Sequence, residues 1–300
     1  MGTATSVNKQ GPPSAYRGRF APSPTGPLHF GSLVAAVGSY LQARASAGVW
    51  LVRVEDIDPP REVPGAARAQ LETLRRFGMA PDEPVTYQSA SRGLHLKALE
   101  RLVREGRAFG CACTRRDLPA SGVYPGTCRA GLPQGAAPRS IRFRIPDRPI
   151  AVVDRVFGSL DHDLNEHCGD FVIRRADGLI AYQLAVVVDD VAAAITEVVR
   201  GSDLLDSSAR QQCVYEALSA TTPGWMHLPL CVDRQGRKLS KSSDADPVER
   251  LEPAAALRLA LAALGHEPPS GRRSLESIWR WGVANWCPQR IPTEPFELNR

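Results

Sequence analysis

Two short segments of this 300-residue sequence carry the residue types that phosphate chemistry requires. The first runs from Arg19 to Ser32, reads RFAPSPTGPLHFGS and precedes a stretch with helical spacing. Unpaired backbone N–H groups and the positive end of the helix dipole favour phosphate at such a helix start. Gly26 and Gly31 allow close backbone approach there, and His29 can donate a hydrogen bond to phosphate oxygens. We expect Ser32 both to cap the helix and to donate to phosphate.

The second segment is a basic loop at residues 237–243 with the sequence RKLSKSS. Its three cations and interleaved hydroxyl groups can clamp a triphosphate and stabilise the charge that builds up on the α-phosphate and the leaving pyrophosphate. Taken singly, the first segment is typical of an ordinary turn and the second of an exposed basic loop. Their pairing in one chain favours a shared nucleotide site.

A third group of chemically active residues consists of Cys111, Cys113 and Cys128, in a segment rich in Pro, Gly and Arg. Three thiolates supply most of a tetrahedral zinc shell. Their C-x-C spacing is tighter than the common C-x2-C, so the residues alone also fit a loop of reduced thiols, and they leave the fourth zinc ligand to water. The other cysteines are scattered among apolar residues, and we expect them to be buried fillers rather than ligands: Cys168, Cys213, Cys231 and Cys287.

These residues need a scaffold that brings them together, and the hydrophobic pattern predicts one. Residues 16–20 alternate as a strand does, residues 32–45 have helical spacing, and residues 50–54 read as a second strand. A strand, a helix and a strand in this order are typical of a βαβ unit with a parallel sheet. Glu55 directly follows the second strand, at the sheet edge where ligands bind in such folds.

The rest of the chain alternates between helices and short strands around an irregular segment at residues 110–144. Further regular elements are predicted as helices at 61–77, 91–104, 207–219 and 253–264, and as strands at 170–173, 195–200 and near 228–232. The basic loop follows the last of these strands. We interpret the irregular segment, which is poor in periodic apolar residues, as an inserted subdomain.

Composition and charge exclude some classes of protein and leave others open. The sequence is 43% hydrophobic and 23% charged, as ordinary soluble globular proteins are. No apolar run approaches the roughly 20 residues that span a bilayer, and residues 1–15 lack the basic start and apolar stretch of a signal peptide. We therefore expect a disordered leader, a cytoplasmic location and no membrane partner. The net charge of +5 tolerates a polyanionic partner without requiring one.

With these features, the sequence resembles the class I aminoacyl-tRNA synthetases, whose two ATP-binding motifs read HIGH and KMSKS. The corresponding segments here read HFGS at residues 29–32 and KLSKS at residues 238–242. A finer match to the glutamyl branch covers roughly residues 17–245, through the segments RFAPSPTGPLHFGSL, VRVEDIDPPR, VVDD, VVRGSDLLDSSARQ and RKLSKS. The departures from the two motifs, Ser32 and Leu239, retain a phosphate donor and apolar loop packing, so ATP binding is still implied.

Within that branch, the chain resembles the short members, the glutamyl-queuosine tRNA(Asp) synthetases. Fewer than sixty residues follow Ser242, too few for the long helical anticodon-binding region of a full glutamyl-tRNA synthetase. The resemblance implies ATP-dependent activation of L-glutamate as its adenylate without tRNA present. It further implies transfer of glutamate to the cyclopentenediol of queuosine at the wobble position of tRNA(Asp). The implied RNA partner is the anticodon stem-loop of that tRNA, a single-stranded target that suits protein recognition, and we expect the protein to be a monomer.

The resemblance also assigns site residues by matching positions. ATP would be bound by His29, Gly31, Ser32, Lys238 and Lys241, of which His29 and Lys241 would be catalytic through positioning and charge stabilisation. Magnesium would accompany ATP, although no carboxylate ligand for it can be named. Glutamate would be bound by Arg19, Phe20, Ala21, Pro22, Ser23, Glu55, Tyr182 and Arg200.

Within this glutamate site, either Arg19 or Arg200 would hold a substrate carboxylate with its planar fork, and Glu55 would pair with the α-ammonium. Taken singly, Arg200 also fits a surface ion pair and Tyr182 ordinary core packing. The zinc site of the family has the order Cys, Cys, Tyr, Cys. The resemblance therefore implies one structural zinc that organises the insert, bound by Cys111, Cys113, Tyr124 and Cys128.

The predicted fold is α/β, with a Rossmann-like parallel sheet as the catalytic core, a small zinc-bearing α/β insert and a short helical C-terminal segment. The expected domains are a leader at 1–15, the two halves of the core at 16–105 and 186–245, the inserted acceptor-type subdomain at 106–185 and the C-terminal segment at 246–300. Three alternatives remain open: a glutamyl-tRNA synthetase-like core that charges a tRNA 3′ end, a small-molecule adenylyltransferase, and a non-catalytic RNA-binding paralogue.

Overall fold

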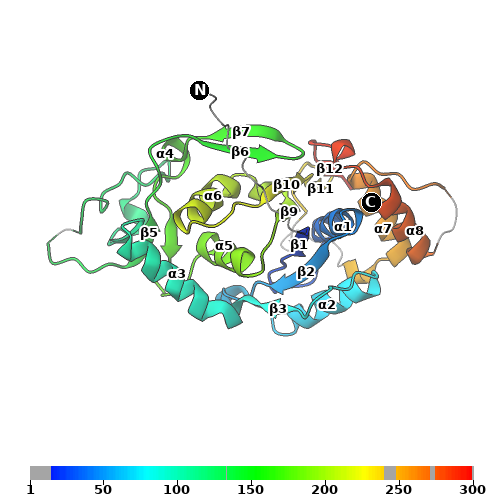
Figure 1. Cartoon of the computed structure of the whole chain (residues 1–300), viewed down its shortest axis with the longest axis horizontal. Coiled ribbons are helices and arrows are strands. Elements are labelled where there is room, and N and C mark those ends of the chain that lie inside the picture. The colour runs from blue at the N-terminus through cyan, green and yellow to red at the C-terminus, as the bar shows by residue number, and fades with distance from the viewer. Residues whose placement is uncertain (1–14, 133, 240–247, 271–273, 299–300) are drawn as a thin grey trace, which may run out of the picture.

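The chain begins with the βαβ unit that the sequence predicts. A computed structural model describes residues 15–132, 134–239, 248–270 and 274–298 (Figure 1). Strand β1 (Arg17–Phe20) leads into helix α1 (Phe30–Ala45), and β2 (Val49–Val54) pairs parallel with β1. The turn between β1 and α1 is therefore placed at the carboxyl edge of a parallel sheet, where ligands bind in open α/β folds.

The central sheet is parallel in most of its pairings. Its strands beyond β1 and β2 are β3 (Thr86–Tyr87), β6 (Ile150–Asp154), β7 (Gly158–His162), β9 (Glu197–Gly201) and β10 (Gly224–Leu228). Strand β3 pairs parallel with β2, and β10 pairs parallel with β9 and β6, while β7 is antiparallel to β6 at the edge. The two sets of strands adjoin where the N–H of Thr196 donates to the carbonyl of Arg17 at 2.9 Å.

Most of the helices around this sheet fall close to the predicted ranges. They are α2 (Ala66–Arg76), α3 (Arg92–Arg104), α5 (Tyr182–Ala192) and α6 (Ser207–Ala217). The prediction that the second helix begins at residue 61 was wrong, because residues 59–61 form a separate 3₁₀ turn. Helix α5 was not predicted at all, since its apolar and β-branched sequence, YQLAVVVDDVA, lacks helical periodicity.

The strand expected near residues 228–232 is in fact two strands. Strand β10 ends at Leu228, and β11 (Cys231–Val232) pairs with β12 (Phe296–Glu297) instead. Pro229 lies between them, and a proline has no N–H with which to continue a ladder. The chain therefore leaves the central sheet at the point where it approaches the basic loop.

The predicted insert contains a small antiparallel sheet. Strands β4 (Ala108–Cys111), β5 (Ser140–Phe143) and β8 (Val172–Arg174) form it, with the short helix α4 (Leu164–His167) nearby. Between β5 and β8 the chain returns to the central sheet to add the hairpin of β6 and β7 (Figure 1). Residues 150–162 thus belong to the central sheet by their pairing, although they lie inside the range expected for the insert.

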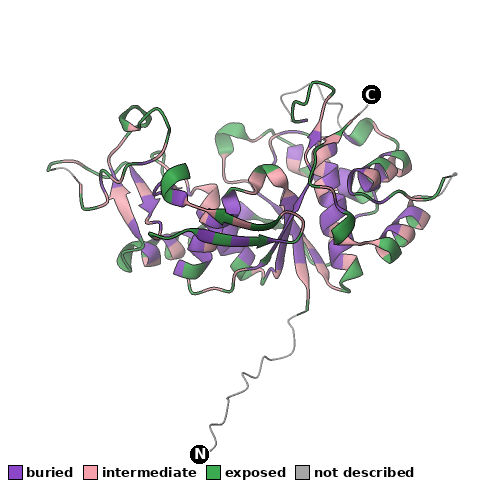
Figure 2. Ribbon diagram, turned by 90° about the horizontal axis from the view of Figure 1, so that it is seen from above, coloured by how far each residue is buried: buried purple, intermediate pink, exposed green. Residues whose placement is uncertain are grey.

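The C-terminal helices α7 (Pro253–Ala263) and α8 (Leu275–Asn285) pack beside α1. Glu252 accepts from the N–H groups of Ala254 and Ala255, and Pro253 occupies the first turn of α7, as the sequence predicts. Figure 2 shows the consequence: the central strands and the inner helix faces are buried, whereas outer faces and loops are exposed. The α/β fold class with its parallel sheet is confirmed.

Candidate active site

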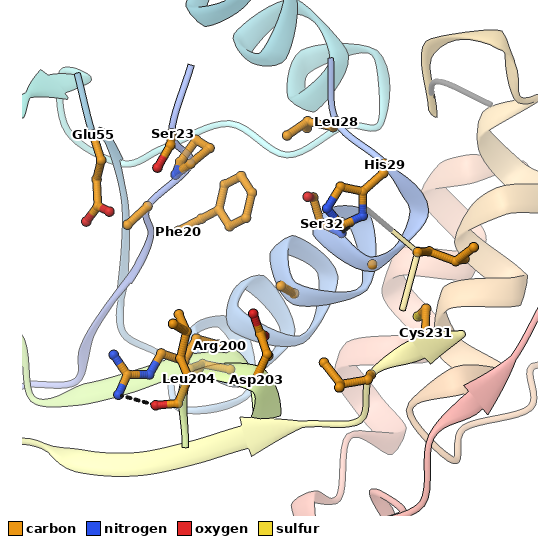
Figure 3. A pocket seen from close by; sticks show the side chains of 18 of the residues that line it. Phe20, Ser23, Leu28, His29, Ser32, Glu55, Arg200, Asp203, Leu204 and Cys231 are labelled. Carbon is orange, nitrogen blue, oxygen red and sulfur yellow. Dashed lines mark hydrogen bonds between the residues drawn. The ribbon is translucent and has the colours of Figure 1, made fainter. Parts of the chain in front are cut away.

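Residues at the ends of neighbouring strands line one cavity of about 430 Å³. Glu55 follows β2 and Arg200 lies in β9, and both face this cavity from one end, whereas His29 and Ser32 lie at the other end (Figure 3). A volume of this order is typical of small-molecule sites. All residues that the resemblance assigns to glutamate line the cavity, as do the described residues assigned to ATP, which are His29, Gly31, Ser32 and Lys238.

The turn before α1 is held in a fixed shape. Gln70 of α2 donates to the carbonyls of Ser23 and Gly26 at 3.0 and 2.7 Å, and Gly26 has a φ of 134°, which favours glycine. The expectation that Ser32 caps α1 was wrong. The helix begins at Phe30, so Ser32 is already in its first turn, and its N–H donates to Nδ1 of His29 at 3.3 Å. This contact makes Nε2 the nitrogen of His29 that can donate to phosphate.

The basic loop approaches the same cavity. Lys238 and Leu239 line it together with His29, Gly31 and Ser32. The ammonium of Lys238 forms an ion pair with Asp203, which lies in the turn after β9. Lys241, the other lysine expected to bind ATP, lies outside the described residues. The two segments that the sequence predicts to bind phosphate therefore meet at one cavity, as far as they are described.

A buried network of charges forms the wall beneath Glu55. Arg19 donates to both oxygens of Asp190, at 3.0 and 3.1 Å, and Arg53 donates to Asp190 at 2.6 Å and to Glu55 at 3.2 Å. Burial alone would raise the pKa of Asp190, but the two guanidinium groups hold it below its usual range. Burial does raise the pKa of Glu55.

The network contains more carboxylates than guanidinium groups. Asp189 lies beside Arg53 as well, and it accepts hydrogen bonds from Gln88 at 2.7 Å and contacts His95 at 2.9 Å. Arg19 and Arg53 therefore face three carboxylates. Because Glu55 lines the cavity and is incompletely compensated, an ammonium group bound there would be favoured.

Arg200 is buried at 6% exposure with neutral partners. Its guanidinium donates to the hydroxyls of Tyr182 and Ser208, to Oε1 of Gln211, to the carbonyl of Leu204 and to Nε2 of His227, at distances of 2.8 to 3.2 Å. None of the described residues brings a carboxylate within ion-pair distance of it. Burial lowers the pKa of Arg200, as expected for a cation without a counter-ion. The cavity thus presents an uncompensated positive charge, which favours a ligand carboxylate.

The three clustered cysteines form a group that could hold a metal ion. The Sγ atoms of Cys111, Cys113 and Cys128 all lie within 4.8 Å of one another, and those of Cys113 and Cys128 are 3.7 Å apart. The hydroxyl of Tyr124 lies 3.5 Å from Sγ of Cys111. Burial tends to raise the pKa of Cys111, but hydrogen bonds from Tyr124 and Arg142 outweigh it and lower that pKa to about 7. A thiol of this kind is a ready metal ligand.

Comparison with known proteins identifies the family. A model of the catalytic domain of class I tRNA synthetases for E and Q matches residues 15–121 and 130–263. The chain belongs to this family. It is 51% identical over 290 residues to a glutamyl-Q tRNA(Asp) synthetase of Chromobacterium violaceum, covering 94% of this chain and 97% of the relative. A glutamyl-Q tRNA(Asp) synthetase of Aromatoleum aromaticum is 50% identical over 297 residues, covering 96% and 93%.

A solved structure agrees with this assignment to the class I synthetases. The glutamate tRNA ligase of Elizabethkingia meningosepticum, determined in complex with its amino acid, superimposes with a TM-score of 0.80 at 27% identity. The match covers 95% of this chain and 67% of that one. The resemblance to the glutamyl branch is therefore confirmed, and the protein is a ligase of the aminoacyl-tRNA synthetase type.

Some residues around this synthetase site were missed by sequence reasoning. The VVDD segment was recognised, yet Asp190 was given no role, although a carboxylate pair inside an apolar run signals buried ion pairing. Asp203 lies in the recognised segment VVRGSDLLDSSARQ but was given no role, and His227 lies in none of the recognised segments. Of the scattered cysteines, Cys213 and Cys231 are buried as expected, and Cys231 lines the cavity; Cys168 and Cys287 are partly exposed.

Among the helices of the described residues, none combines the length and the apolar character needed to cross a bilayer.

Proposed function

We propose that this protein activates L-glutamate with ATP, without requiring tRNA, and transfers the glutamyl group to the cyclopentenediol of queuosine in tRNA(Asp). Relatives about 50% identical over nearly their whole length carry the name glutamyl-Q tRNA(Asp) synthetase, which supports this substrate. The solved glutamate tRNA ligase holds its amino acid on the same fold, which supports glutamate. A cytoplasmic monomer, as expected from the sequence, completes the proposal.

The observation that carries the proposal is the two-ended cavity. At one end, the uncompensated guanidinium of Arg200 and the carboxylate of Glu55 suit the carboxylate and ammonium groups of an amino acid (Figure 3). At the other end, the start of α1 with His29 and Lys238 of the basic loop suit phosphates. The carboxylate of the substrate glutamate and the α-phosphorus of ATP that it attacks would therefore lie side by side.

Tyr182 has a defined part in this arrangement. Its hydroxyl accepts from Arg200 at 3.2 Å, so its own hydrogen is available to donate to a substrate carboxylate. The positive charge of Arg200 would strengthen that donor. Arg19, Phe20, Ala21, Pro22 and Ser23 would form the rest of the glutamate wall.

The chemistry needs no nucleophilic side chain. A carboxylate oxygen of glutamate forms a bond to the α-phosphorus of ATP while the bond to pyrophosphate breaks, and a queuosine hydroxyl then attacks the activated carbonyl as AMP leaves. His29, Gly31, Ser32 and the lysines of the basic loop would stabilise charge on the phosphates, with Mg²⁺ accompanying the ATP.

The cysteine cluster fits zinc as a structural ion. Zinc–sulfur bonds of about 2.3 Å at tetrahedral angles separate two sulfurs by about 3.8 Å, and Cys113 and Cys128 are 3.7 Å apart. Tyr124, whose hydroxyl lies 3.5 Å from Sγ of Cys111, would supply the fourth ligand. We expect metal analysis of the purified protein to give one zinc per chain; a folded, active protein free of metal would remove zinc from the proposal.

Two assays test the proposed activity. Glutamate-dependent exchange of labelled pyrophosphate into ATP, with no RNA added, is expected for the wild type and not for H29A. Labelled glutamate should then appear on queuosine-containing tRNA(Asp), but not on an unmodified tRNA(Asp) transcript or on tRNA(Glu). R280A, which changes an exposed residue of α8, is the matched control and should behave as the wild type.

The same assays separate the alternatives. Label at a tRNA 3′ terminus would establish a glutamyl-tRNA synthetase-like core. The likeness of the fold to the glutamate tRNA ligase is compatible with that activity as well. Glutamate-independent exchange would indicate a different adenylyltransferase. Binding of RNA without any exchange would indicate a non-catalytic paralogue.

A further inference from the structure

We propose that His227 and Asp154 position Arg200, and that a neutral imidazole is used so that the charge of Arg200 stays available to the substrate carboxylate. This inference rests on the proposed function, in which Arg200 lies at the glutamate end of the cavity. It assigns a role to two buried residues that do not line the cavity themselves.

The hydrogen bonds of His227 fix which of its nitrogens carries the proton. His227 lies in β10 with 0% exposure, and its Nδ1 is 2.6 Å from Oδ2 of Asp154. An ionised carboxylate only accepts, so Nδ1 must be the donor. The other nitrogen, Nε2, then presents a lone pair, and Nε of Arg200 donates to it at 3.0 Å. Ser208, whose hydroxyl lies 3.4 Å from Nε2, also accepts from Arg200, so its own hydrogen can point to the same lone pair.

Asp154 is itself rigidly held at the end of β6. Its Oδ1 accepts from the backbone N–H groups of Val156 and Phe157 at 2.9 Å, and its Oδ2 accepts from the backbone N–H of His227 at 3.1 Å. Burial alone would raise the pKa of Asp154, but these bonds and His227 lower it, so the carboxylate is the stable form. The chain of contacts from β6 through β10 to β9 thus sets the orientation of Arg200.

The partners of the other buried arginines, compared with those of Arg200, explain why residue 227 is a histidine. Arg19 and Arg53 donate directly to Asp190, and Arg53 also pairs with Glu55, so both arginines have counter-ions. Arg200 is fixed as firmly, yet the nearest carboxylate in its chain of contacts, Asp154, is separated from it by the ring of His227. The separation orients the guanidinium without supplying a counter-ion. A carboxylate side chain at position 227 would orient it as well but would compete with the substrate.

Substitutions at position 227 test this role through the kinetics of glutamate-dependent pyrophosphate exchange. H227A is expected to raise the KM for glutamate by about tenfold to a hundredfold, with the KM for ATP nearly unchanged, because a hydrogen bond to a charged group is lost. H227Q, whose Oε1 can accept from Arg200, should restore most of the loss. H227E should bind glutamate as poorly as H227A or worse, although it supplies an acceptor.

Asp154→Asn gives a second, independent test. The oxygen of the new amide would keep the bonds to the backbone of Val156 and Phe157, which turns its NH2 toward His227. The bond from the backbone N–H of His227 would be lost, and the tautomer with hydrogen on Nε2 would be favoured. That hydrogen would oppose the N–H of Arg200. D154N should therefore raise the KM for glutamate, and ¹⁵N NMR of the imidazole should show protonated Nδ1 in the wild type and protonated Nε2 in the variant.

A matched control separates positioning from general destabilisation. His266 is buried at 1% exposure in the loop after α7, where it contacts Leu264 and Cys287. H266Q should lower the melting temperature but leave the KM for glutamate unchanged. Equal increases of the KM values for glutamate and ATP in H227A, or full glutamate affinity in H227E, would overturn the inference. Absence of exchange in the wild type would instead overturn the proposed function, and the tautomer measurement would still decide the state of His227.

Discussion

At the scale of single residues, the two arginines that the sequence left as alternatives for the substrate carboxylate differ in their partners. Arg19 shares two hydrogen bonds with Asp190, whereas Arg200 contacts only neutral groups among the described residues. A guanidinium that has a counter-ion gains little from a second carboxylate. The structure therefore favours Arg200 as the residue that binds the substrate carboxylate, and Arg19 as a support for the wall below.

Replacement of Arg200 by Lys is expected to raise the KM for glutamate about a hundredfold, because an ammonium cannot reproduce the planar set of five donors. Pyrophosphate exchange at varied glutamate and at varied ATP measures the effect. R280K, on the exposed face of α8, is the control. A proportional rise in the KM for ATP would contradict the assignment of Arg200 to the amino-acid end.

The burial of His227 predicts how the free energy of unfolding depends on pH. Burial lowers the pKa of His227 below its ordinary value. The unfolded chain therefore takes up a proton at this position below about pH 6.5 while the folded chain does not, so the free energy of unfolding falls as the pH drops through that range. Urea unfolding between pH 7.5 and 5.5 should show a smaller decrease for H227Q than for the wild type. H167Q, at an exposed position, should retain the full decrease.

Residue types were predictable from the sequence, but partners were not. The resemblance indicated Arg19, Glu55 and Arg200 as polar site residues, and all three reach the cavity. That Asp190 pairs with Arg19 depends on a contact between positions 171 apart, which no local pattern encodes. The same holds for His227, which is separated from Asp154 by 73 positions.

At the scale of elements, the first turn of α1 leaves little room for added atoms. A Cβ at Gly31 would lie 3.1 Å from Cε1 of His29, closer than ordinary contacts allow. G31A is therefore expected to displace the ring and to raise the KM for ATP about tenfold, with little effect on glutamate, since small misplacements of catalytic groups are costly. G93A, in α3, is the control because a Cβ there meets nothing within 4 Å. Unchanged ATP kinetics in G31A would show that His29 does not need its present position.

Elements with clear periodicity were predicted well, and those decided by tertiary contacts were not. The βαβ unit from β1 to β2 and helices α3, α6 and α7 fall within a few residues of their predicted ranges. Helix α5 was missed because it is buried on most sides, so its apolar residues do not follow one face. The division between β10 and β11 was missed because Pro229 was read as part of one strand.

At the scale of the whole molecule, the segment around the three clustered cysteines differs from the rest in what holds it together. The cysteine cluster packs only Cys111, Tyr124 and Cys128 as fully buried apolar residues, whereas the other two clusters each join many side chains from several elements. With so few apolar contacts, this segment would depend on the proposed zinc for its stability. Removal of zinc by a chelator should therefore increase hydrogen exchange around residues 111–128 while the exchange of β1, α1 and β9 stays slow.

The same treatment separates the two half-reactions. Glutamate-dependent pyrophosphate exchange should persist in the chelated protein, because the cavity lies in the core, while transfer to tRNA should decline. Restoration by added zinc, but not by magnesium, is the control. Loss of exchange in parallel with loss of zinc would instead indicate that the metal supports the core.

The path of the chain through the hairpin of β6 and β7 has a consequence for exchanging parts between related enzymes. Asp154 ends β6, and β6 is reached only after the chain has passed through β4 and β5. A chimera that replaces residues 106–185 as one block would therefore import a foreign residue at the position of Asp154, the proposed anchor for Arg200, along with the rest of the insert. Under the roles proposed above, recombination at the outer borders of this stretch would change nucleic-acid preference and the choice of amino acid together.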